Sequence, residues 1–384
     1  MQVINVESIE AVIVDLPLRR LQRFSALGTN RQSAVIILAR STDGVVGIGE
    51  AVTPGGPWWS GESVESIKLH IDQYLAPLVI GTNAFLLESL QRNMNSALHG
   101  NFFAKAGLEM ALLDLIGKTL DLPVSHLLGG ACRDSIEVLW PLATGDIDQE
   151  IAEAEQKIEA RLHRTFKLKM GALPVDEDVR RATAIARALD GKATVRVDPN
   201  EMWNESTATW AMHRLQDVGI EQIEQPVPRW NVEAMARLSQ RFDIDVMIDE
   251  GMCTGHELQR IIALRAADTV SLKVMKSGGL RATKVLADVA AQSGLVLYMG
   301  TFLETSIGTA ANMQLCATLP ELPLGGELIG PLLMAEDLCT QPARYRDFKL
   351  WLNEGAGIGA TLDFDKLNHY RRDRGRRTTA VVSV

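Results

Sequence analysis

Residues 164–170 read RTFKLKM, and this strand-like run is the first of six segments that each lead to a charged side chain. The charges follow one another at intervals of 29, 26, 25 and 24 residues, and the last comes 54 residues later, about two further periods. A unit of one strand and one helix has this length, so the spacing predicts a βα barrel with the charges at its strand ends. They are Lys169, Asp198, Glu224, Asp249, Lys273 and Glu327.

Apolar strand-like runs alternate with helical stretches through the middle of the chain. This alternation requires parallel strands joined by crossover helices, and eight such strands close a barrel. We therefore predict an α/β fold, a modified TIM barrel of the (β/α)7β type, over residues 131–335. Seven helical stretches separate the expected strands, which are residues 136–143, 165–170, 193–198, 220–224, 245–249, 269–273, 295–300 and 325–329.

A smaller α+β domain is predicted over residues 1–130. Residues 3–52 alternate like strands and carry the hairpin signal Ser41-Thr42-Asp43-Gly44, whereas a helical period begins near residue 62. Strands followed by a block of helices are typical of an α+β domain, which we expect to cap the barrel. Residues 336–384 break the barrel alternation and are expected to return to the capping domain.

Two polar or glycine-rich loops of the capping domain are candidate lids. Residues 51–61 contain two adjacent tryptophans among prolines and glycines, and residues 20–30 form a second polar stretch. A lid over the barrel mouth would shield the chemistry from water. The lid side chains expected to reach the substrate are Pro54, Trp58 and Trp59.

Composition excludes several classes of protein. The formal net charge of −9 argues against broad nucleic-acid binding, which needs Lys and Arg to neutralise phosphates. The basic cluster RRDRGRR, residues 371–377, is interpreted as a solvated terminus.

The chain has no run of 18 apolar residues and no basic start of a signal peptide, so we expect a cytoplasmic protein without a membrane span. Its four separated cysteines, without CxxC spacing, indicate reduced thiols.

Two lysines share one face of the strand that opens the series. Side chains alternate along a strand, so Lys167 and Lys169 point to the same side and the apolar residues between and beside them to the other. Two like charges one pleat apart each favour the neutral form of the other. One of these lysines is therefore expected to act as a general base near neutral pH.

Three carboxylates occupy successive strand ends. Asp198, Glu224 and Asp249 would repel one another strongly unless a cation lay among them. The set contains no His or Cys, which favours a hard ion, Mg²⁺ or Mn²⁺, over zinc. The sequence therefore predicts one divalent metal site, with Asn200 and Glu250 beside the ligands.

Lys273 stands on the sixth strand, across an eight-strand ring from Lys169. A metal between two lysines suits the movement of a proton on or off the carbon next to a carboxylate, because the metal stabilises the enolate. Glu327 is expected to hydrogen-bond to, or protonate, a second part of the substrate. Lys276 is expected at the surface.

Several motifs, in order along nearly the whole chain, resemble those of the enolase superfamily, in the muconate-lactonizing subgroup that includes the chloromuconate enzymes. They are KLKM (Lys167 and Lys169), VDPN (Asp198), IEQP (Glu224), IDE (Asp249), SLKVMKSGG (Lys273), GIGEA (47–51), GTFLETSIGT (300–309) and GELIGP (326–331).

The resemblance implies a capping domain over a modified barrel, one bound Mn²⁺ or Mg²⁺ and an octamer. It also implies a reaction, the cyclisation of the small dicarboxylate cis,cis-muconate to muconolactone. In that reaction Lys169 protonates the α carbon, Lys167 helps to hold charge, Lys273 lies on the other face and Glu327 matches a proton donor. Thr301, Phe302 and Ile329 fall at positions expected to line the substrate pocket.

Some positions depart from the pattern of the family. Ile329 stands where some members carry an aromatic residue, Gly251 replaces a common Ser, and the Trp-Trp lid leans toward the chloromuconate type. A chloromuconate cycloisomerase is therefore an alternative, as is a racemase, dipeptide epimerase or succinylbenzoate synthase with the same lysines. A Schiff-base aldolase on Lys273 and a binding protein without activity also remain open.

Overall fold

The computed structural model describes residues 3–23 and 28–373 of the chain. Part of the predicted 20–30 lid and the end of the basic cluster at 371–377 lie outside the described residues. A three-stranded antiparallel sheet opens the chain, as predicted, with strand order β1-β2-β3. Its strands are β1 (Val6–Arg23), β2 (Gly28–Ser41) and β3 (Val46–Val52), and the last two are joined at residues 42–45, which overlap the turn predicted at 41–44.

Helices follow the sheet and pack on it, as the change of period at residue 62 predicts. The longest, α4, is almost entirely buried and lies across β3. Gly49 permits this contact, because a Cβ atom there would collide with the carbonyl oxygen of Gly107 on the helix. The segments are α1 (Val64–His70), η1 (Ile71–Leu75), α2 (Ala76–Val79), α3 (Leu87–Ala97), α4 (Phe102–Leu120) and α5 (Val124–Leu127).

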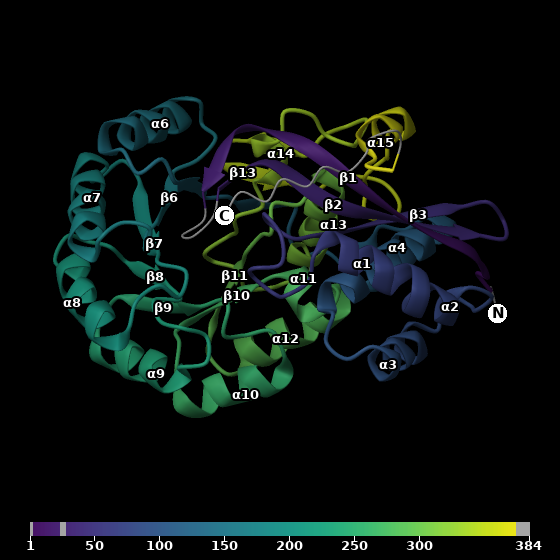
Figure 1. Ribbon diagram of the computed structural model, residues 1–384, viewed down its shortest axis with the longest axis horizontal. Helices are drawn as coiled ribbons and strands as arrows, with labels where there is room; N and C mark the ends of the chain where they lie inside the picture. The colour runs from purple at the N-terminus through teal and green to yellow at the C-terminus, as the bar shows by residue number, and fades with distance from the viewer. Residues whose placement is uncertain (1–2, 24–27, 374–384) are drawn as a thin grey trace.

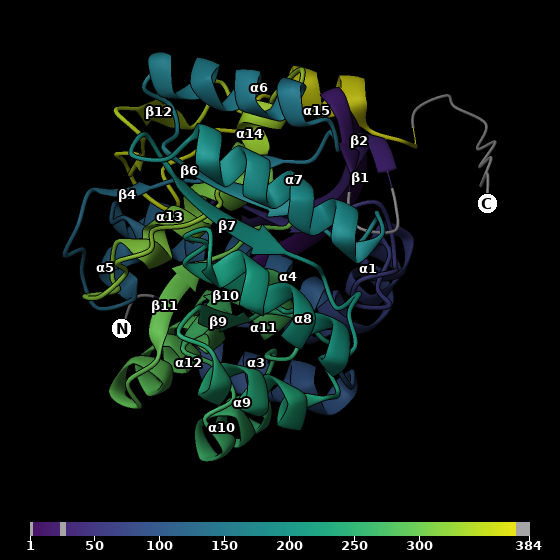
Figure 2. The ribbon, with the colours of Figure 1, turned by 90° about the vertical axis from the view of Figure 1, so that its left-hand side faces the viewer.

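The middle of the chain forms a curled parallel sheet with strand order β11-β10-β9-β8-β7-β6-β5. Helices α6 to α10 and α12 form an arc outside it, and Figure 2 shows α6, α7 and α8 in sequence along the outer surface (Figures 1 and 2). The strands are β5 (Trp140–Leu142), β6 (Thr165–Lys169), β7 (Thr194–Asp198), β8 (Gln222–Glu224), β9 (Asp245–Ile248), β10 (Thr269–Leu272) and β11 (Val296–Met299).

A helix is present in each of the seven intervals where a helical stretch was predicted. Asp146, Asn204, Asn231, Thr254 and Thr305 begin five of them with a side-chain cap on a backbone N–H. The helices are α6 (Ile147–Glu159), α7 (Val175–Ala188), α8 (Glu205–Gln216), α9 (Val232–Arg241), α10 (Gly255–Leu264), α12 (Leu280–Gln292) and α13 (Ser306–Cys316), with one short turn, α11 (Val274–Ser277), after β10.

The expected eighth strand, residues 325–329, is reduced to two isolated β-bridges, both made by Gly326. Gly326 pairs in parallel with both Val138 and Met299 and so connects the two sides of the ring. A Cβ atom at Gly326 would crowd Met299, so glycine allows the close approach. The ring is therefore closed at a single point and not by a full strand.

The expected first strand, residues 136–143, is split in two. Its first half, β4 (Ser135–Glu137), pairs antiparallel with β13 (Lys349–Trp351), which in turn pairs with β12 (Arg344–Arg346), and only β5 joins the barrel. The C-terminal segment then reaches β1 of the first domain through α15 (Phe364–Tyr370) (Figure 1). A short helix, α14 (Gly330–Leu333), precedes these elements.

A buried carboxylate joins the capping domain to the barrel. Glu50 on β3 accepts hydrogen bonds from the backbone N–H of Thr305 (2.9 Å), from Thr305 Oγ1 (2.7 Å) and from the backbone N–H of Gly308 (2.7 Å). Glu50 therefore lies at the N-terminus of α13, where partial positive charge favours an anion. Burial nevertheless raises the pKa of Glu50 to about 7.

We expect Glu50 to make stability depend on pH. Its pKa is higher in the folded chain than its ordinary value of 4.5, so the folded state binds the proton more tightly and stability falls as pH rises from about 4.5 to about 7. Relative to Glu50→Gln, wild type should lose roughly 3 kcal/mol over that window. Urea titrations of both proteins at several pH values measure the difference, and a wild type that gains stability over Glu50→Gln as pH rises would contradict the expectation.

No helix among the described residues combines the length and the apolar character needed to cross a membrane. The four cysteines, Cys132, Cys253, Cys316 and Cys339, are free thiols, as their spacing predicts.

Candidate active site

Lys167 and Lys169 project from β6 into the open end of the barrel. Lys167 is 3% exposed, and its Nζ donates to Glu224 Oε2 (2.9 Å) and to Glu327 Oε2 (2.5 Å). Lys169 Nζ donates to Asp198 Oδ2 (2.5 Å) and Asn200 Oδ1 (3.1 Å). The two lysines therefore share a face, but each binds carboxylates.

The mutual charge effect expected for the lysine pair does not govern Lys167. Burial lowers its pKa, but the carboxylates of Glu224 and Glu327 and then Asp198 outweigh burial and hold the pKa well above its ordinary value. Lys167 is therefore a fixed cation, and Lys169 stays the lysine of the pair that is expected to act as the general base. The sequence could not supply the reason, since Glu327 lies 160 residues further along the chain.

The predicted acids of β7, β8 and the end of β9 are buried in the same region. Burial raises the pKa of Asp198, but Lys169 and Lys167 outweigh it and leave the pKa lowered. Burial and then the charge of Asp198 raise the pKa of Glu224 to about 7. Burial also opposes ionisation of Asp249, but Lys273 and Lys276 hold its pKa far below the ordinary value.

Lys273 follows β10, and its Nζ donates to Asp249 Oδ2 (2.6 Å). Burial lowers the pKa of Lys273, but Asp249 and then Glu224 raise it above the ordinary value, so the group is an ammonium. Gly300, after β11, leaves room for this side chain, because a Cβ atom there would collide with the stem of Lys273. The amine lies near the Phe302 ring, 4.7 Å from its centroid.

Lys276 is buried, contrary to the expectation of a surface lysine. It is 1% exposed, and its Nζ donates to the carbonyl oxygen (2.7 Å) and Oδ1 (2.8 Å) of Asp249. The short turn α11 folds back after β10 and places Lys276 under Asp249. A regular strand pattern does not predict this placement.

Glu250 and Asn200 lie beside the acids, as expected from the sequence. Asn200 Nδ2 donates to Glu250 Oε1 (3.1 Å), while Glu250 Oε2 is buried without a hydrogen-bond partner. Burial and then Asp249 raise the pKa of Glu250 to about 8. Gln225 supports the same segment, since its Oε1 accepts from the backbone N–H groups of Asp249 (3.0 Å) and Gly251 (3.1 Å).

The donor set has the chemistry of a hard cation site. This cluster contains five acids and four lysines, so it carries one surplus negative charge when all of them are ionised. The acids are Asp198, Glu224, Asp249, Glu250 and Glu327, and the lysines are Lys167, Lys169, Lys273 and Lys276. The oxygen Oε2 of Glu250 is buried in this cluster without a hydrogen-bond donor. Among residues 3–23 and 28–373, however, no three or more His, Cys, Asp or Glu side chains are grouped so that they could hold a metal ion, and each of the three predicted acids is hydrogen-bonded to a lysine.

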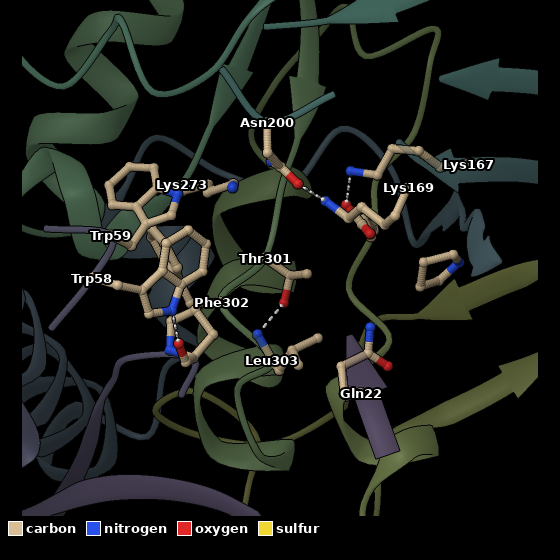
Figure 3. Close-up of a pocket in the computed structure, with 13 residues that line it drawn as sticks. Gln22, Trp58, Trp59, Lys167, Lys169, Asn200, Lys273, Thr301, Phe302 and Leu303 are labelled. Carbon is tan, nitrogen blue, oxygen red and sulfur yellow. Dashed lines mark hydrogen bonds and ion pairs between the residues drawn. The ribbon is translucent and has the colours of Figure 1, made fainter. Parts of the chain in front are cut away.

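Aromatic side chains form one wall of the pocket in front of these charges. Figure 3 shows Lys273 with Trp58, Trp59 and Phe302 on one side and Lys167 and Lys169 on the opposite side. Trp59 packs edge-on against Phe302, with ring centroids 4.7 Å apart, and Trp58 Nε1 donates to the carbonyl oxygen of Pro54 (2.6 Å). Pro54 also lines the pocket, so this part of the predicted lid covers the barrel mouth.

Arg229 holds the lid against the barrel. Its Nη1 donates to the carbonyl oxygen of Trp59 (3.0 Å), its Nη2 donates to Glu201 (2.6 Å), and its guanidinium lies over the Trp59 ring. Glu201 and the neighbouring Asn200 both have positive φ angles, 69° and 44°. Such backbone persists only where the surroundings hold it, and it is frequent at functional sites.

The pocket wall includes three residues that were not individually predicted to line it, and it omits one that was expected there. Gln22, Pro141 and Leu303 line the cavity beside Thr301 and Glu327. Ile329 is fully buried and does not line it. Nothing in local periodicity indicates Pro141 or Leu303, whereas Gln22 falls within the loop predicted as a second lid.

We expect Lys276→Met to destabilise the fold. Removal of the buried ammonium leaves the carbonyl oxygen and Oδ1 of Asp249 without a donor, which costs roughly 3–5 kcal/mol. Urea titration measures the loss. Lys284→Met is the matched control, because Lys284 forms an i,i+4 pair at the surface and should change stability by no more than about 1 kcal/mol. Equal stability of the two variants would contradict the prediction.

The chain matches family models and curated proteins over most of its length. Residues 8–129 match the family model described as mandelate racemase / muconate lactonizing enzyme, N-terminal domain, and residues 149–366 match enolase C-terminal domain-like. A chloromuconate cycloisomerase of Cupriavidus pinatubonensis (strain JMP 134 / LMG 1197) is 52% identical over 95% of this chain and 98% of its own length. Muconate cycloisomerase 1 of Pseudomonas putida is 45% identical over 96% and 98%.

A solved structure agrees with the fold over almost the whole chain. The muconate lactonizing enzyme from Pseudomonas fluorescens, complexed with muconolactone, superposes with a TM-score of 0.95 at 42% identity. The match covers 97% of this chain and 100% of that chain.

Proposed function

Because the chain belongs to the mandelate racemase / muconate lactonizing enzyme family of the enolase superfamily, we propose that it is a cycloisomerase that converts cis,cis-muconate to muconolactone. Support comes above all from Lys169 and Lys273, which lie on opposite sides of one pocket beside the buried acids. The relatives that match most of the chain carry the names of muconate and chloromuconate cycloisomerases. The reaction is an isomerisation of a small dicarboxylate.

In the proposed reaction one carboxylate oxygen of the substrate forms the lactone C–O bond to the carbon that lies β to the other carboxylate, at the double bond conjugated with that carboxylate. The π electrons move toward the other carboxylate, which becomes an enolate. Lys169 then gives the proton on Nζ to the α carbon of that enolate, and solvent restores the proton to the lysine. In reverse, the same amine removes the proton.

Asp198, Glu224 and Asp249 would hold a divalent cation, with Glu250 and Asn200 supporting them. Enzymes of this family generally use a divalent metal, and we propose Mn²⁺ or Mg²⁺ because the donors are all carboxylates. When bound, such an ion supplies positive charge to the carboxylate that becomes the enolate. The surplus of one negative charge among the five acids and four lysines of the site favours binding of the divalent cation.

Lys167 and Lys273 supply fixed positive charge at the two sides of the pocket. Each is an ammonium held by buried carboxylates, so each can stabilise negative charge without reorganisation. Glu327 is held by Lys167 at 2.5 Å and lines the pocket, so we propose that it faces the substrate as a hydrogen-bonding or proton-donating group.

The proposed function is tested by incubation of the protein with Mn²⁺ and cis,cis-muconate. We expect the diene absorbance to fall and muconolactone to appear in the proton NMR spectrum. Removal of the metal with a chelator should stop the reaction, and added Mn²⁺ should restore it. Unchanged diene in the presence of metal would overturn the proposal.

A chloromuconate cycloisomerase is the second candidate. The identity of 52% to a protein of that name, against 45% to a muconate cycloisomerase, favours it. A comparison of kcat/KM for cis,cis-muconate and a chlorinated cis,cis-muconate decides the preference, and a chloride electrode shows whether chloride leaves. Roughly tenfold higher kcat/KM for the chlorinated substrate would favour the second candidate.

A Schiff-base aldolase, a racemase and the two remaining superfamily activities receive less support. The aldolase needs a neutral amine, whereas the pKa of Lys273 is raised and its Nζ is bound to Asp249. A mandelate-type racemase would be expected to place a His on the seventh strand, and β11 carries Val-Leu-Tyr-Met. Dipeptide epimerases and succinylbenzoate synthases would share the lysines, but the most similar relatives named above carry neither name.

We also propose that the protein is a cytoplasmic homo-oligomer, with the octamer of the resembled family as the expected size. Support comes from large apolar side chains of the capping domain that are about half exposed, Leu69, Tyr74 and Leu86. Light scattering of the purified protein measures the assembly, and a monomer at micromolar concentration would contradict it.

A further inference from the structure

We propose that Gln22 binds the second carboxylate of the substrate, the one that attacks the diene. This inference rests on the proposed function. Gln22 lies near the end of β1 and lines the pocket, yet it is only 2% exposed. Its Oε1 has no hydrogen-bond partner, and no described residue hydrogen-bonds with its side-chain nitrogen. The two N–H donors of Nε2 are the groups that could bind a carboxylate, whereas the buried Oε1 is an acceptor and would not.

The chain places Gln22 through an irregularity in the first sheet. Pro17 pairs with Arg31 and Gln22 with Thr29, so β1 advances five residues while β2 advances two. Extra residues of this kind bend a strand and redirect its side chains. Gln22 is thereby brought over the barrel mouth, where Figure 3 shows it on the side of the pocket away from Asn200.

A clamp beside Gln22 fixes this part of β1 to the barrel. Arg20 donates twice to Glu153 on α6 (2.7 and 2.9 Å) and once to the carbonyl oxygen of Pro141 (3.1 Å). Trp140 Nε1 donates to the same carboxylate (2.9 Å), and the Arg20 guanidinium lies over its ring. Since Pro141 also lines the pocket, the clamp sets the distance between Gln22 and the barrel wall.

Most other polar groups on this side of the pocket already make hydrogen bonds. Thr301 Oγ1 donates to Glu304 (2.5 Å) and accepts from the backbone N–H of Leu303 (2.9 Å). Asn200 binds Lys169 and Glu250, and the lysines bind the acids. Glu327 Oε2 accepts a hydrogen bond from Lys167 (2.5 Å). Among the described lining residues, the Gln22 amide is therefore the donor with unused hydrogen-bonding capacity on that wall.

A neutral donor suits the chemistry of the attacking group. A lysine or arginine at this position would draw charge from the carboxylate and weaken it as a nucleophile. The amide of Gln22 can orient the carboxylate by a hydrogen bond and leave most of its charge in place. Orientation of the two reacting groups is a large part of the advantage of a bound cyclisation.

Two variants and a pair of ligands test the assignment. Gln22→Leu should lower kcat/KM for cis,cis-muconate roughly 10- to 100-fold, because it removes a hydrogen bond to a charged group. Gln22→Glu should lower it further through repulsion. Gln149→Leu, on the exposed surface of α6, is the matched control and should leave turnover unchanged.

Binding of unreactive acids separates this inference from the proposed function. With Mn²⁺ present, calorimetry should show that wild type binds adipate, a six-carbon dicarboxylate, more tightly than hexanoate. In Gln22→Leu the advantage of adipate should fall at least about tenfold, while hexanoate binding stays the same. If wild type turns over muconate but Gln22→Leu keeps both its kcat/KM and the adipate preference, the Gln22 assignment is wrong. If wild type does not turn over muconate, the proposed function itself fails.

Discussion

Lys169→Ala should reduce turnover of cis,cis-muconate by roughly 10²- to 10⁴-fold, the contribution of a well-placed general acid. Lys169 is the one lysine of β6 with appreciable side-chain exposure, 14% against 3% for Lys167, and it lines the pocket. Its Nζ is held by Asp198 and Asn200 in a fixed position. Loss of diene absorbance under saturating substrate measures the effect.

A measurement of Mn²⁺ binding distinguishes the loss of proton transfer from the loss of the metal site. Lys169→Ala removes the ammonium that occupies Asp198, so metal affinity measured by calorimetry should be retained or increased. The control is Lys192→Ala, since Lys192 forms an exposed pair with Glu155 on the barrel surface. Turnover of Lys169→Ala within about threefold of the control would show that this lysine does not transfer the proton.

Asp198→Asn should abolish both metal binding and turnover. Asp198 is fully buried, and its pKa is lowered, so it is an anion at neutral pH and a strong ligand for a hard cation. An amide in its place is a weak ligand and also leaves Lys169 and Lys167 without the Asp198 charge. Loss of a direct ligand should weaken Mn²⁺ more than the roughly 10- to 100-fold typical of a residue outside the coordination sphere.

Calorimetry with Mn²⁺ measures this loss without any substrate. The control is Asp176→Asn, because Asp176 is exposed in the first turn of α7 and pairs only weakly with Arg180. Thermal unfolding of both variants shows whether Asp198→Asn still folds. A folded Asp198→Asn protein that binds Mn²⁺ as wild type does would remove Asp198 from the metal site.

The charge spacing predicts much of the candidate site because side chains alternate along a strand. A residue at the end of a parallel strand must lie at the same rim as its counterparts, so Lys169, Asp198 and Glu224 can be grouped from their positions in the chain. The aromatic lid was also predictable, since Trp58 and Trp59 stand in a glycine- and proline-rich loop. What the spacing could not predict was the pairing within the group, such as Lys167 with Glu327.

The sequence alone determined the alternation of strands and helices, the class of the barrel and the charged set at its mouth, because these depend on local periodicity and spacing. Only the tertiary structure decided that Lys276 is buried under Asp249, that Gly326 closes the ring at one point and that Gln22 reaches the pocket. Each of these depends on a contact between segments far apart in the chain or on a local irregularity. Such contacts leave no periodic trace in the residues on either side.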